Sequence, residues 1–419
     1  MRRRPRNDDD VDSRAELVAA RKPHNYCCKV AGRGSLVLGV IVALSRLITR
    51  HPTRPSDGGG GGGVVVFRRP CVPFVTVVLP SVVNPAGRSR RLAAIAATWG
   101  ARAHAIFVEH SGDASGFPEW STEACDFPRR LEVPVPPSQG VARLRWVLTT
   151  VNETDFAFMV NDHTAVVPEN LACYLRSLDP AEPLYLGHAL VQRGRGGDRM
   201  FNSGAAGYVL SRASLRLVAR AFYELPEACG AAPSSAWLQG NPGLVLATCL
   251  ASQGVLPGDT RAADAHRFNA FGLVRTATGR VDDWYERMHE RLPFERPSLI
   301  ARGPSCCATH TISFHYVEAV EQYALRGALD AMAHFRDVAP ENIDAAAEAW
   351  LDEHWPRKDL GGYARPLPRR PSPDSDTAAE AQRLREDRAA VRDVLLHKIR
   401  IATNGSVCRD DDEKSSTSS

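Results

Sequence analysis

The sequence has no hydrophobic run of the length that crosses a bilayer, and it carries little net charge. Its 419 residues sum to a net charge of +4, and about twelve Lys and Arg against about five Asp and Glu lie up to Arg54. The rest of the chain therefore has a net charge of about −3, which argues against a nucleic-acid-binding surface. With 44% apolar and 24% charged residues, the composition is that of a globular protein with a buried core.

The apolar stretch Gly34 to Leu44 has about 12 residues with its flanks, whereas a spanning helix takes about 20. Basic residues precede it, and these would hold the N-terminus in the cytosol. We expect 1–33 to be a basic cytosolic tail and 34–48 a signal-anchor. A cleaved signal peptide, a short buried helix and a disordered basic leader are the alternatives.

Two features fit an oxidising compartment. Sequons stand at Asn152 and Asn404, and ten cysteines are many for a cytosolic chain of this size. Chance sequons and free buried cysteines are the alternatives. The expected disulfides are Cys229 with Cys249 and Cys306 with Cys307.

The composition divides the rest of the chain into three parts. Residues 49–70 include a run of glycines and are expected to form a flexible stem. Residues 71–355 have the apolar density of a folded domain. Residues 356–419 are expected to hold a Pro-rich linker, a peripheral helix over Ala378 to Ile399 and a disordered tail.

The order of elements in the body predicts an α/β fold with a mostly parallel sheet. Strands are predicted over Cys71 to Pro80, Ala103 to His110 and Asp155 to Val160. Helices are predicted over Arg88 to Trp99 and Gly140 to Val151. Alternating strands and helices of this kind give parallel strands joined by right-handed crossovers.

The third strand ends in Asn161-Asp162-His163. Ligands of such sheets bind just beyond the carboxyl ends of the strands, so we expect these three side chains to face an open crevice. Carboxylates at this place could hold a divalent cation. An ordinary strand-to-loop transition is the alternative.

Longer motifs lie further along the chain. RMFNSGAAGYVLSRASL, Arg199 to Leu215, and SCCATHTISFHYV, Ser305 to Val317, resemble signature stretches of the T-synthase-like group (core 1 β-1,3-galactosyltransferases) of glycosyltransferase family 31. RLAAIAATWG, Arg91 to Gly100, resembles the early segment of that family. The resemblance covers roughly Cys71 to Leu325.

The resemblance implies a GT-A domain, which is a Rossmann-like α/β fold, in a type II membrane protein of the Golgi or ER with a luminal catalytic domain. It further implies UDP-galactose as donor, Mn²⁺ as cofactor and GalNAc-O-Ser/Thr of glycoproteins as acceptor, in β-1,3 linkage. The matched positions would bind the donor through Thr98, Trp99, Asn161, Asp162, Asn202, Ser203 and Gly204, the acceptor through Trp284 and Tyr285, and the metal through Asp162, His163 and His315.

Each of these groups also has a structural interpretation. The segment from Asn202 to Gly207 has small residues that suit close approach to a sugar, but it could equally be a Gly-rich turn before a helix. His315 stands in an apolar run, where a histidine is often a core residue. Trp284 and Tyr285 could equally pack in an apolar core.

The sequence also departs from the family. The family has three consecutive aspartates where this chain has Asn161-Asp162-His163, so weaker Mn²⁺ binding is expected. The family's general base falls on Gly243, and no acidic residue lies between Glu227 and Asp259. The catalytic base is therefore unknown, although proton transfer contributes about 10²- to 10⁴-fold to such reactions.

Three hypotheses remain. The first is an active or weakened β-1,3-galactosyltransferase. The second is a catalytically silent member that acts as a chaperone of a T-synthase-like partner, and a dimer is also possible. An inverting transferase with another donor sugar is a third, weaker hypothesis.

Overall fold

The computed structural model describes residues 74–80, 87–100, 102–110, 130–133, 141–152, 154–193, 197–229, 242–262, 265–289, 292–294, 305–334, 345, 349 and 376–402. All of them belong to one compact unit, Ser45–Ser419. Four predicted features lie outside the described residues: the tail (1–33), the signal-anchor (34–48), the stem (49–70) and the sequon at Asn404. Among the described helices, none is both long and apolar enough for a membrane span.

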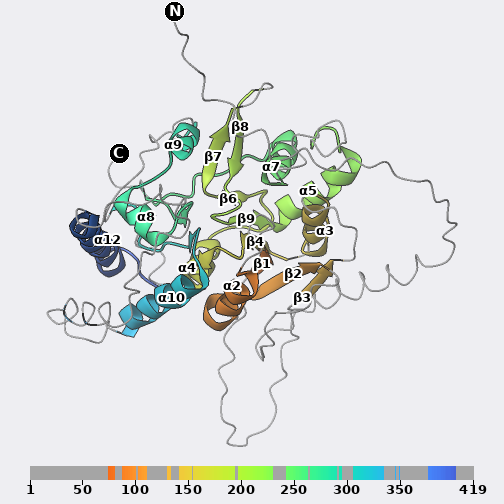
Figure 1. Cartoon of the computed structure of the whole chain (residues 1–419). Helices are drawn as coiled ribbons and strands as arrows, with labels where there is room; N and C mark the ends of the chain where they lie inside the picture. Colours follow the sequence, from red (N-terminus) through yellow and green to blue (C-terminus); the bar gives the residue numbers. More distant parts are fainter. Residues whose placement is uncertain are drawn as a thin grey trace, which may run out of the picture. The chain divides into compact units, whose positions relative to one another are not determined.

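A six-stranded sheet forms the centre of the domain (Figure 1), in the order β3-β2-β1-β4-β9-β6. Its strands are β1 (Phe74–Leu79), β2 (Ala105–His110), β3 (Arg130–Val133), β4 (Phe156–Asn161), β6 (Tyr185–Gly187) and β9 (Tyr208–Ser211). β1 pairs in parallel with β2 and β4, and β2 with β3, whereas β9 runs antiparallel to β4 and β6. The mixed α/β class with parallel strands is therefore confirmed.

The predicted elements of the first half form close to their expected places. The first helix, α2 (Arg88–Ile95), continues as a π-helical turn, η1 (Ala96–Gly100), and the second helix is α3 (Val141–Thr150). β4 extends one residue beyond the predicted strand, so Asn161 is still paired with Leu79 of β1.

Helices cover both faces of the sheet because alternate residues of its central strands point to opposite sides. Val75 and Val77 of β1 pack with α3, α5 (Arg212–Glu224) and α7 (Pro242–Ser252). Phe74 and Val78 pack on the other side with α2 and α4 (Pro168–Leu175). Ser211 ends β9 and caps α5, since its hydroxyl accepts the backbone N–H of Ser214 at 3.3 Å.

Shorter elements complete the domain beside the carboxyl end of β4. They are the β7 (Ala189–Gln192) and β8 (Arg199–Asn202) hairpin, the three short strands β5 (Ala165–Val166), β10 (Phe268–Asn269) and β11 (Ser313–Phe314), and the helices α8 (Leu273–Thr278), α9 (Asp283–His289) and α10 (Ala319–His334). β11 lies between β10 and β5, so it joins the chain after residue 305 to the segment that follows β4.

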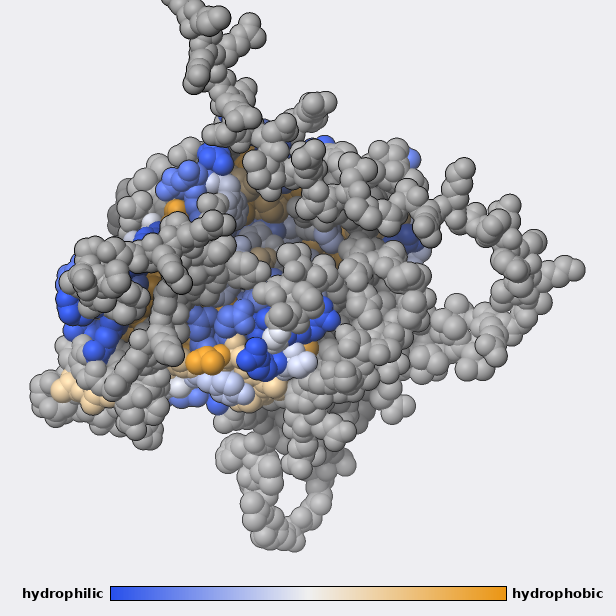
Figure 2. All heavy atoms as spheres, viewed as in Figure 1, coloured by the Kyte–Doolittle hydropathy of each residue, from blue (hydrophilic) through white to orange (hydrophobic). Residues whose placement is uncertain are grey.

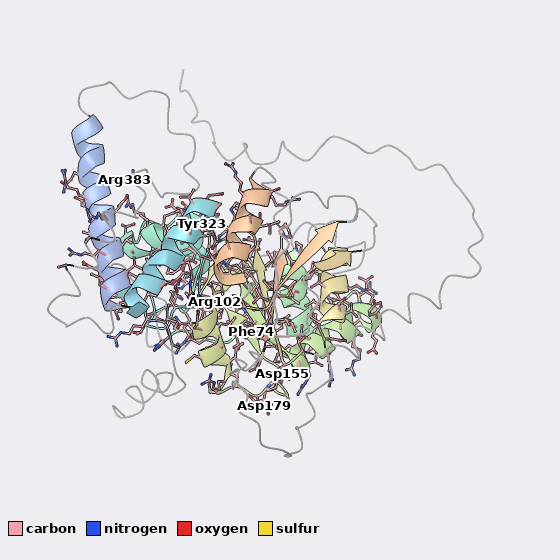
Figure 3. All side chains as sticks on the ribbon, turned by 90° about the horizontal axis from the view of Figure 1, so that it is seen from below. Phe74, Arg102, Asp155, Asp179, Tyr323 and Arg383 are labelled. Carbon is pink, nitrogen blue, oxygen red and sulfur yellow. A yellow bond between two sulfur atoms is a disulfide. The ribbon has the colours of Figure 1, made fainter. Side chains whose placement is uncertain are left out.

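The predicted C-terminal helix is α12 (Asp376–His397), and it lies beside α10 (Figure 3). Its last turns are not peripheral: Val391, Val394 and Leu395 are buried in an apolar cluster with residues of α8 and α10. The side chains that the structure describes in the first half of the helix, such as Gln382 and Arg385, are exposed. On the face shown in Figure 2, the described surface is largely hydrophilic with separate hydrophobic spots.

Candidate functional site

Asn161 ends β4 and turns the chain at the edge of the sheet. Its Oδ1 accepts the backbone N–H of His163 at 2.9 Å and the hydroxyl of Thr164 at 3.1 Å. Strand pairing ends after Asn161, and its side chain forms a local turn with the next residues, as short polar side chains do. It is the one member of the triplet that stays partly exposed.

Asp162 is buried against Arg91 of α2. Both Nε and Nη2 of Arg91 reach its Oδ2, at 2.9 and 2.8 Å, and the two side chains are 1% and 0% exposed. The expectation that the whole triplet faces an open crevice is therefore wrong for Asp162. The physical reason is that the guanidinium supplies the hydrogen bonds and opposite charge that a carboxylate needs when it leaves water.

His163 and His315 approach the same place from different segments. His163 is 4% and His315 5% exposed, so they are also more buried than expected. The Nδ1 of His163 lies 3.3 Å from Oε1 of Glu318, and the Nε2 of His315 lies 3.5 Å from Nδ2 of Asn161. A backbone hydrogen bond of 2.9 Å from Val317 to the His163 carbonyl fixes the two segments together.

Burial keeps both imidazoles neutral. Desolvation lowers the pKa of His163, Arg91 lowers it further, and the carboxylates of Asp162 and Glu318 oppose these effects. For His315, desolvation and the neighbouring His163 lower the pKa to about 3. Neutral imidazole is the form that binds metal ions, so both rings are in the correct protonation state for a ligand.

Thr98 and Trp99 lie behind this cluster and not on an open surface. Trp99 is 1% exposed, and its Nε1 donates to Oε1 of Gln322 at 3.0 Å. The Nε2 of Gln322 in turn donates to the carbonyl of Thr164 at 3.0 Å. The hydroxyl of Thr98 donates to the Ala94 carbonyl within the helix, at 2.7 Å. The hydrogen bonds from Trp99 through Gln322 to Thr164 therefore tie η1, α10 and the turn after β4 together.

The segment Asn202 to Gly207 forms the turn between β8 and β9. Asn202 is fully buried, and its Nδ2 donates to the Tyr185 carbonyl at 3.2 Å, whereas Ser203 is half-buried and Gly204 is exposed. Gly207 has φ +84°, and a Cβ there would lie 2.7 Å from the ring of Phe158. The group that approaches the Gly207 backbone too closely for a side chain is thus the Phe158 ring.

The aromatic pair on α9 is divided between surface and interior. Trp284 is 37% exposed, and its Nε1 donates to Oδ2 of Asp282 at 3.1 Å. Tyr285 is 3% exposed and packs edge-on against Phe271. Of the two predicted acceptor residues, Trp284 is accessible to a ligand, whereas Tyr285 belongs to the core.

The cysteine pairs come together as predicted, and the base position is a glycine. Cys229 is bonded to Cys249, and Cys306 to Cys307. Gly243 lies in the first turn of α7, the helix that carries Cys249. Asn152 is half-buried, and its glycosylation stays a prediction.

Sequence reasoning missed two groups of polar residues. Glu318, whose side chain is 42% exposed, follows the SFHYV motif directly, and it contacts both His163 and Arg91. The available signal was its position directly before α10 and directly after the motif. The second group is a cluster of His188, His266 and His289. These histidines are too far apart in sequence for spacing to reveal them.

A mixed α/β domain with parallel strands and a polar cluster at the carboxyl end of a central strand is compatible with a Rossmann-like glycosyltransferase. No family model matches the chain. Over 180 residues, 42% of its length, the chain is 28% identical to glycoprotein-N-acetylgalactosamine 3-beta-galactosyltransferase 1 of Xenopus laevis. The match spans about half (45%) of that relative. It supports a relationship to the T-synthase-like proteins of glycosyltransferase family 31.

Proposed function

We propose that this chain is a glycosyltransferase that transfers galactose from UDP-galactose to GalNAc-O-Ser/Thr of glycoproteins in β-1,3 linkage. The observation that carries the proposal is the meeting of Asn161, His163, His315 and Glu318 at the carboxyl end of β4. This edge is where open α/β sheets bind their ligands. The similarity to a galactosyltransferase supports the choice of the transferred sugar.

The residues at this place fit a divalent cation, with one change from the predicted ligands. His163 and His315 are neutral, and Glu318 offers a partly exposed carboxylate beside His163. Asp162 fits less well because both hydrogen bonds from Arg91 go to its carboxylate. We therefore assign Glu318 the ligand role predicted for Asp162. Mn²⁺ bound there would supply positive charge for the diphosphate leaving group.

Activity is tested with the purified chain, UDP-galactose, Mn²⁺ and a GalNAc-peptide. We expect a galactosylated product that a β-1,3-specific galactosidase removes, and no product with His315→Ala. His104→Ala is the matched control, since His104 directly precedes β2 and so lies at the opposite, amino edge of the sheet. The proposal is wrong if neither UDP-galactose nor any other common UDP-sugar is turned over. Turnover with a different UDP-sugar would identify another transferase of the family.

Donor binding can be measured without turnover. At about a hundredfold excess over Kd, a ligand that binds only the folded state adds roughly 2.7 kcal/mol to its stability. We expect UDP with Mn²⁺ to raise the melting temperature of the wild-type chain. His315→Ala should remove most of that increase, and His104→Ala should not.

A second candidate function is supported by Asp162 and Gly243. Arg91 holds the one carboxylate of the triplet, and the base position is a glycine in α7. Both features suit a silent relative that assists the folding of a T-synthase-like partner. This candidate predicts association with the newly made partner, and unchanged partner activity in cells without the chain would exclude it.

The proposal includes a type II location in the Golgi or ER membrane, with residues 34–48 as anchor. The Cys229–Cys249 disulfide is consistent with an oxidising lumen. Carbonate extraction tests the anchor, because release of the full-length protein into the supernatant would contradict it.

A further inference from the structure

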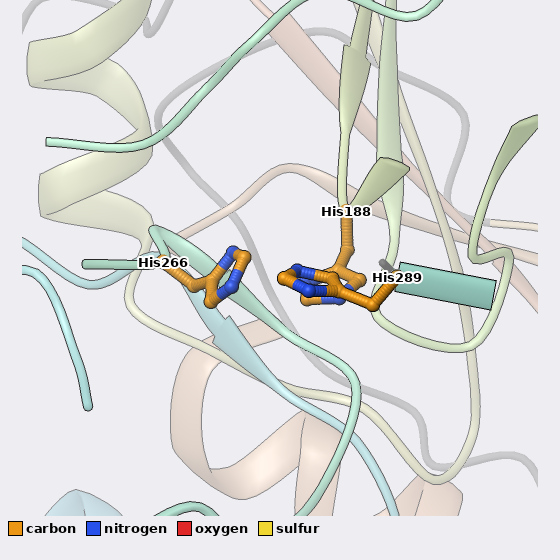
Figure 4. Close-up of side chains that lie close together, drawn as sticks. All are labelled: His188, His266 and His289. Carbon is orange, nitrogen blue, oxygen red and sulfur yellow. The ribbon is translucent and has the colours of Figure 1, made fainter. Parts of the chain in front are cut away.

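His188, His266 and His289 come together from three separate segments (Figure 4). His188 lies between β6 and β7, His266 lies two residues before β10, and His289 is the last residue of α9. Their ligand nitrogens all lie within 4.8 Å of one another. Within the part of the chain that the structure describes, this is the one such group of three or more His, Cys, Asp or Glu side chains.

The three rings face one another in a largely closed space. The ring centroids of His188 and His266 are 4.4 Å apart, and those of His266 and His289 are 5.1 Å apart. His188 and His289 are 2% and 1% exposed. His266 is partly exposed, so an ion could enter on its side.

The contacts of His188 fix which of its nitrogens is available. Its Nδ1 lies 2.7 Å from the carbonyl of Phe268. A carbonyl can only accept, so Nδ1 carries the proton and Nε2 presents a lone pair. This is the arrangement that orients metal-binding histidines, in which the second ring nitrogen donates to a backbone carbonyl. In this structure the Tyr285 hydroxyl, 2.7 Å from Nε2, donates to that lone pair, so it would have to turn away from Nε2 when an ion binds there.

His266 supplies an independent observation. Its Nε2 is buried and makes no hydrogen bond to any described residue. Buried polar atoms without a partner are rare in native structures, because the lost hydration is not replaced. A bound ion would satisfy this nitrogen.

Burial favours the neutral form of His188 and His266. Desolvation lowers the pKa of His188 to about 3, with contributions from His289 and Arg261. The pKa of His266 is lowered well below its ordinary value, again mainly by desolvation. The positive charge of Arg261 is offset by Asp259, whose Oδ2 lies 2.6 Å from its Nη2. The imidazoles of His188 and His266 can therefore act as ligands without first losing a proton.

We propose that His188, His266 and His289 bind one Zn²⁺ ion, with the Tyr285 hydroxyl beside the fourth coordination position. Imidazole nitrogens suit Zn²⁺ better than Mn²⁺ or Ca²⁺, which prefer oxygen ligands. Tetrahedral Zn–N bonds of about 2.0–2.1 Å place the nitrogens about 3.4 Å apart, so side-chain shifts of about 1.4 Å or less complete the site. The ion would fasten α9 to the β6–β7 connection and to the segment before β10.

The test is zinc binding by the tag-free full-length chain after treatment with a chelator. In His163→Ala, which disables the site at β4, we expect one Zn²⁺ per chain by dialysis and elemental analysis, and a higher melting temperature on adding Zn²⁺ alone. His266→Gln should weaken binding at least tenfold while melting like the wild type in chelator. His163→Ala is the control that separates this site from the one at β4, and it should bind Zn²⁺ normally.

Replacement of Zn²⁺ by Co²⁺ tests the geometry without any variant, because tetrahedral Co²⁺ with nitrogen ligands absorbs visible light strongly. The proposal fails if the wild-type chain binds no Zn²⁺, if Co²⁺ gives no such absorption, or if His266→Gln and His289→Gln both bind Zn²⁺ as the wild type does. None of these outcomes depends on UDP-sugar turnover, so this site and the proposed function can fail separately.

Discussion

Arg91 and Asp162 form a buried ion pair that joins α2 to the end of β4 across 71 residues of sequence. Two guanidinium nitrogens donate to one carboxylate oxygen, at 2.9 and 2.8 Å. Because both side chains are almost completely inaccessible, neither charge can regain water if the other is removed. The pair therefore couples the folding of the first helix to the shape of the candidate site.

Substitution of Arg91 should destabilise the domain strongly. We expect Arg91→Met to cost about 3–5 kcal/mol, because it leaves the Asp162 carboxylate buried without a partner. Urea unfolding measures this loss in the free energy of unfolding. The control is Arg212→Met, whose ion pair with Asp155 is partly exposed and should contribute about 0–1 kcal/mol. Equal effects of the two substitutions would show that the Asp162 carboxylate regains water when Arg91 is lost.

Gly207 offers a second test of local packing. Its φ of +84° disfavours any L side chain, and an added Cβ would meet the Phe158 ring at 2.7 Å. We expect Gly207→Ala to destabilise the fold by about 2–4 kcal/mol, from backbone strain together with overpacking. Gly254→Ala is the matched control, since φ is +79° there and no described atom lies within 4 Å of the added Cβ.

The comparison of these two variants isolates the contact with Phe158. Gly254→Ala should cost only about 1 kcal/mol, which is the strain of the left-handed conformation. If both variants lose the same stability in urea, then the Phe158 ring moves aside and the close approach does not require glycine.

The sequence predicted the central strands well because their information is local. Continuous apolar runs such as Phe156 to Val160 belong to strands covered on both faces, and the alternation of strands with helices implies parallel pairing. The antiparallel partners β6 and β9 were not predicted, because pairing direction at the edge of a mixed sheet depends on the path of the connections.

The sequence predicted where the candidate site lies, but it did not predict that its side chains are buried. Asn161 to His163 do end the central strand, yet the fate of Asp162 depends on Arg91, which comes from another element. The histidine cluster is non-local in the same way, since His188 and His289 are brought together only by the packing of α9 on β7. Motif spacing does not carry such long-range information.

Acid should destabilise the chelator-treated protein through His315. Its pKa is about 3 in the folded state against 6.5 for an ordinary histidine. Between these values the unfolded chain binds a proton that the folded chain does not, so this stability is complete above pH 6.5 and falls as the pH decreases toward 3. The loss should be about 1.4 kcal/mol per pH unit for one such histidine.

The variant His315→Gln tests that assignment. We measure the unfolding free energy in urea between pH 6.5 and 4. In this variant its slope against pH should be smaller by the contribution of one proton, which is about 1.4 kcal/mol per pH unit. His163, His188 and His266, whose pKa values are also lowered by burial, would contribute to the remaining slope. An unchanged slope in His315→Gln would mean that water reaches this imidazole in the folded protein.

Glu318 allows metal binding to be separated from proton transfer. If its carboxylate holds the cation beside His163, Glu318→Gln should weaken Mn²⁺ binding on the order of 10- to 100-fold, and high Mn²⁺ should restore the rate of galactosyl transfer. If Glu318 were instead the general base, the rate would fall by about 10²- to 10⁴-fold and stay low at any Mn²⁺ concentration. The control is Glu224→Gln, which removes an exposed carboxylate on α5 and should leave the Mn²⁺ dependence unchanged. A rate in Glu318→Gln equal to that of the wild type at low Mn²⁺ would exclude both roles, because either one requires the negative charge.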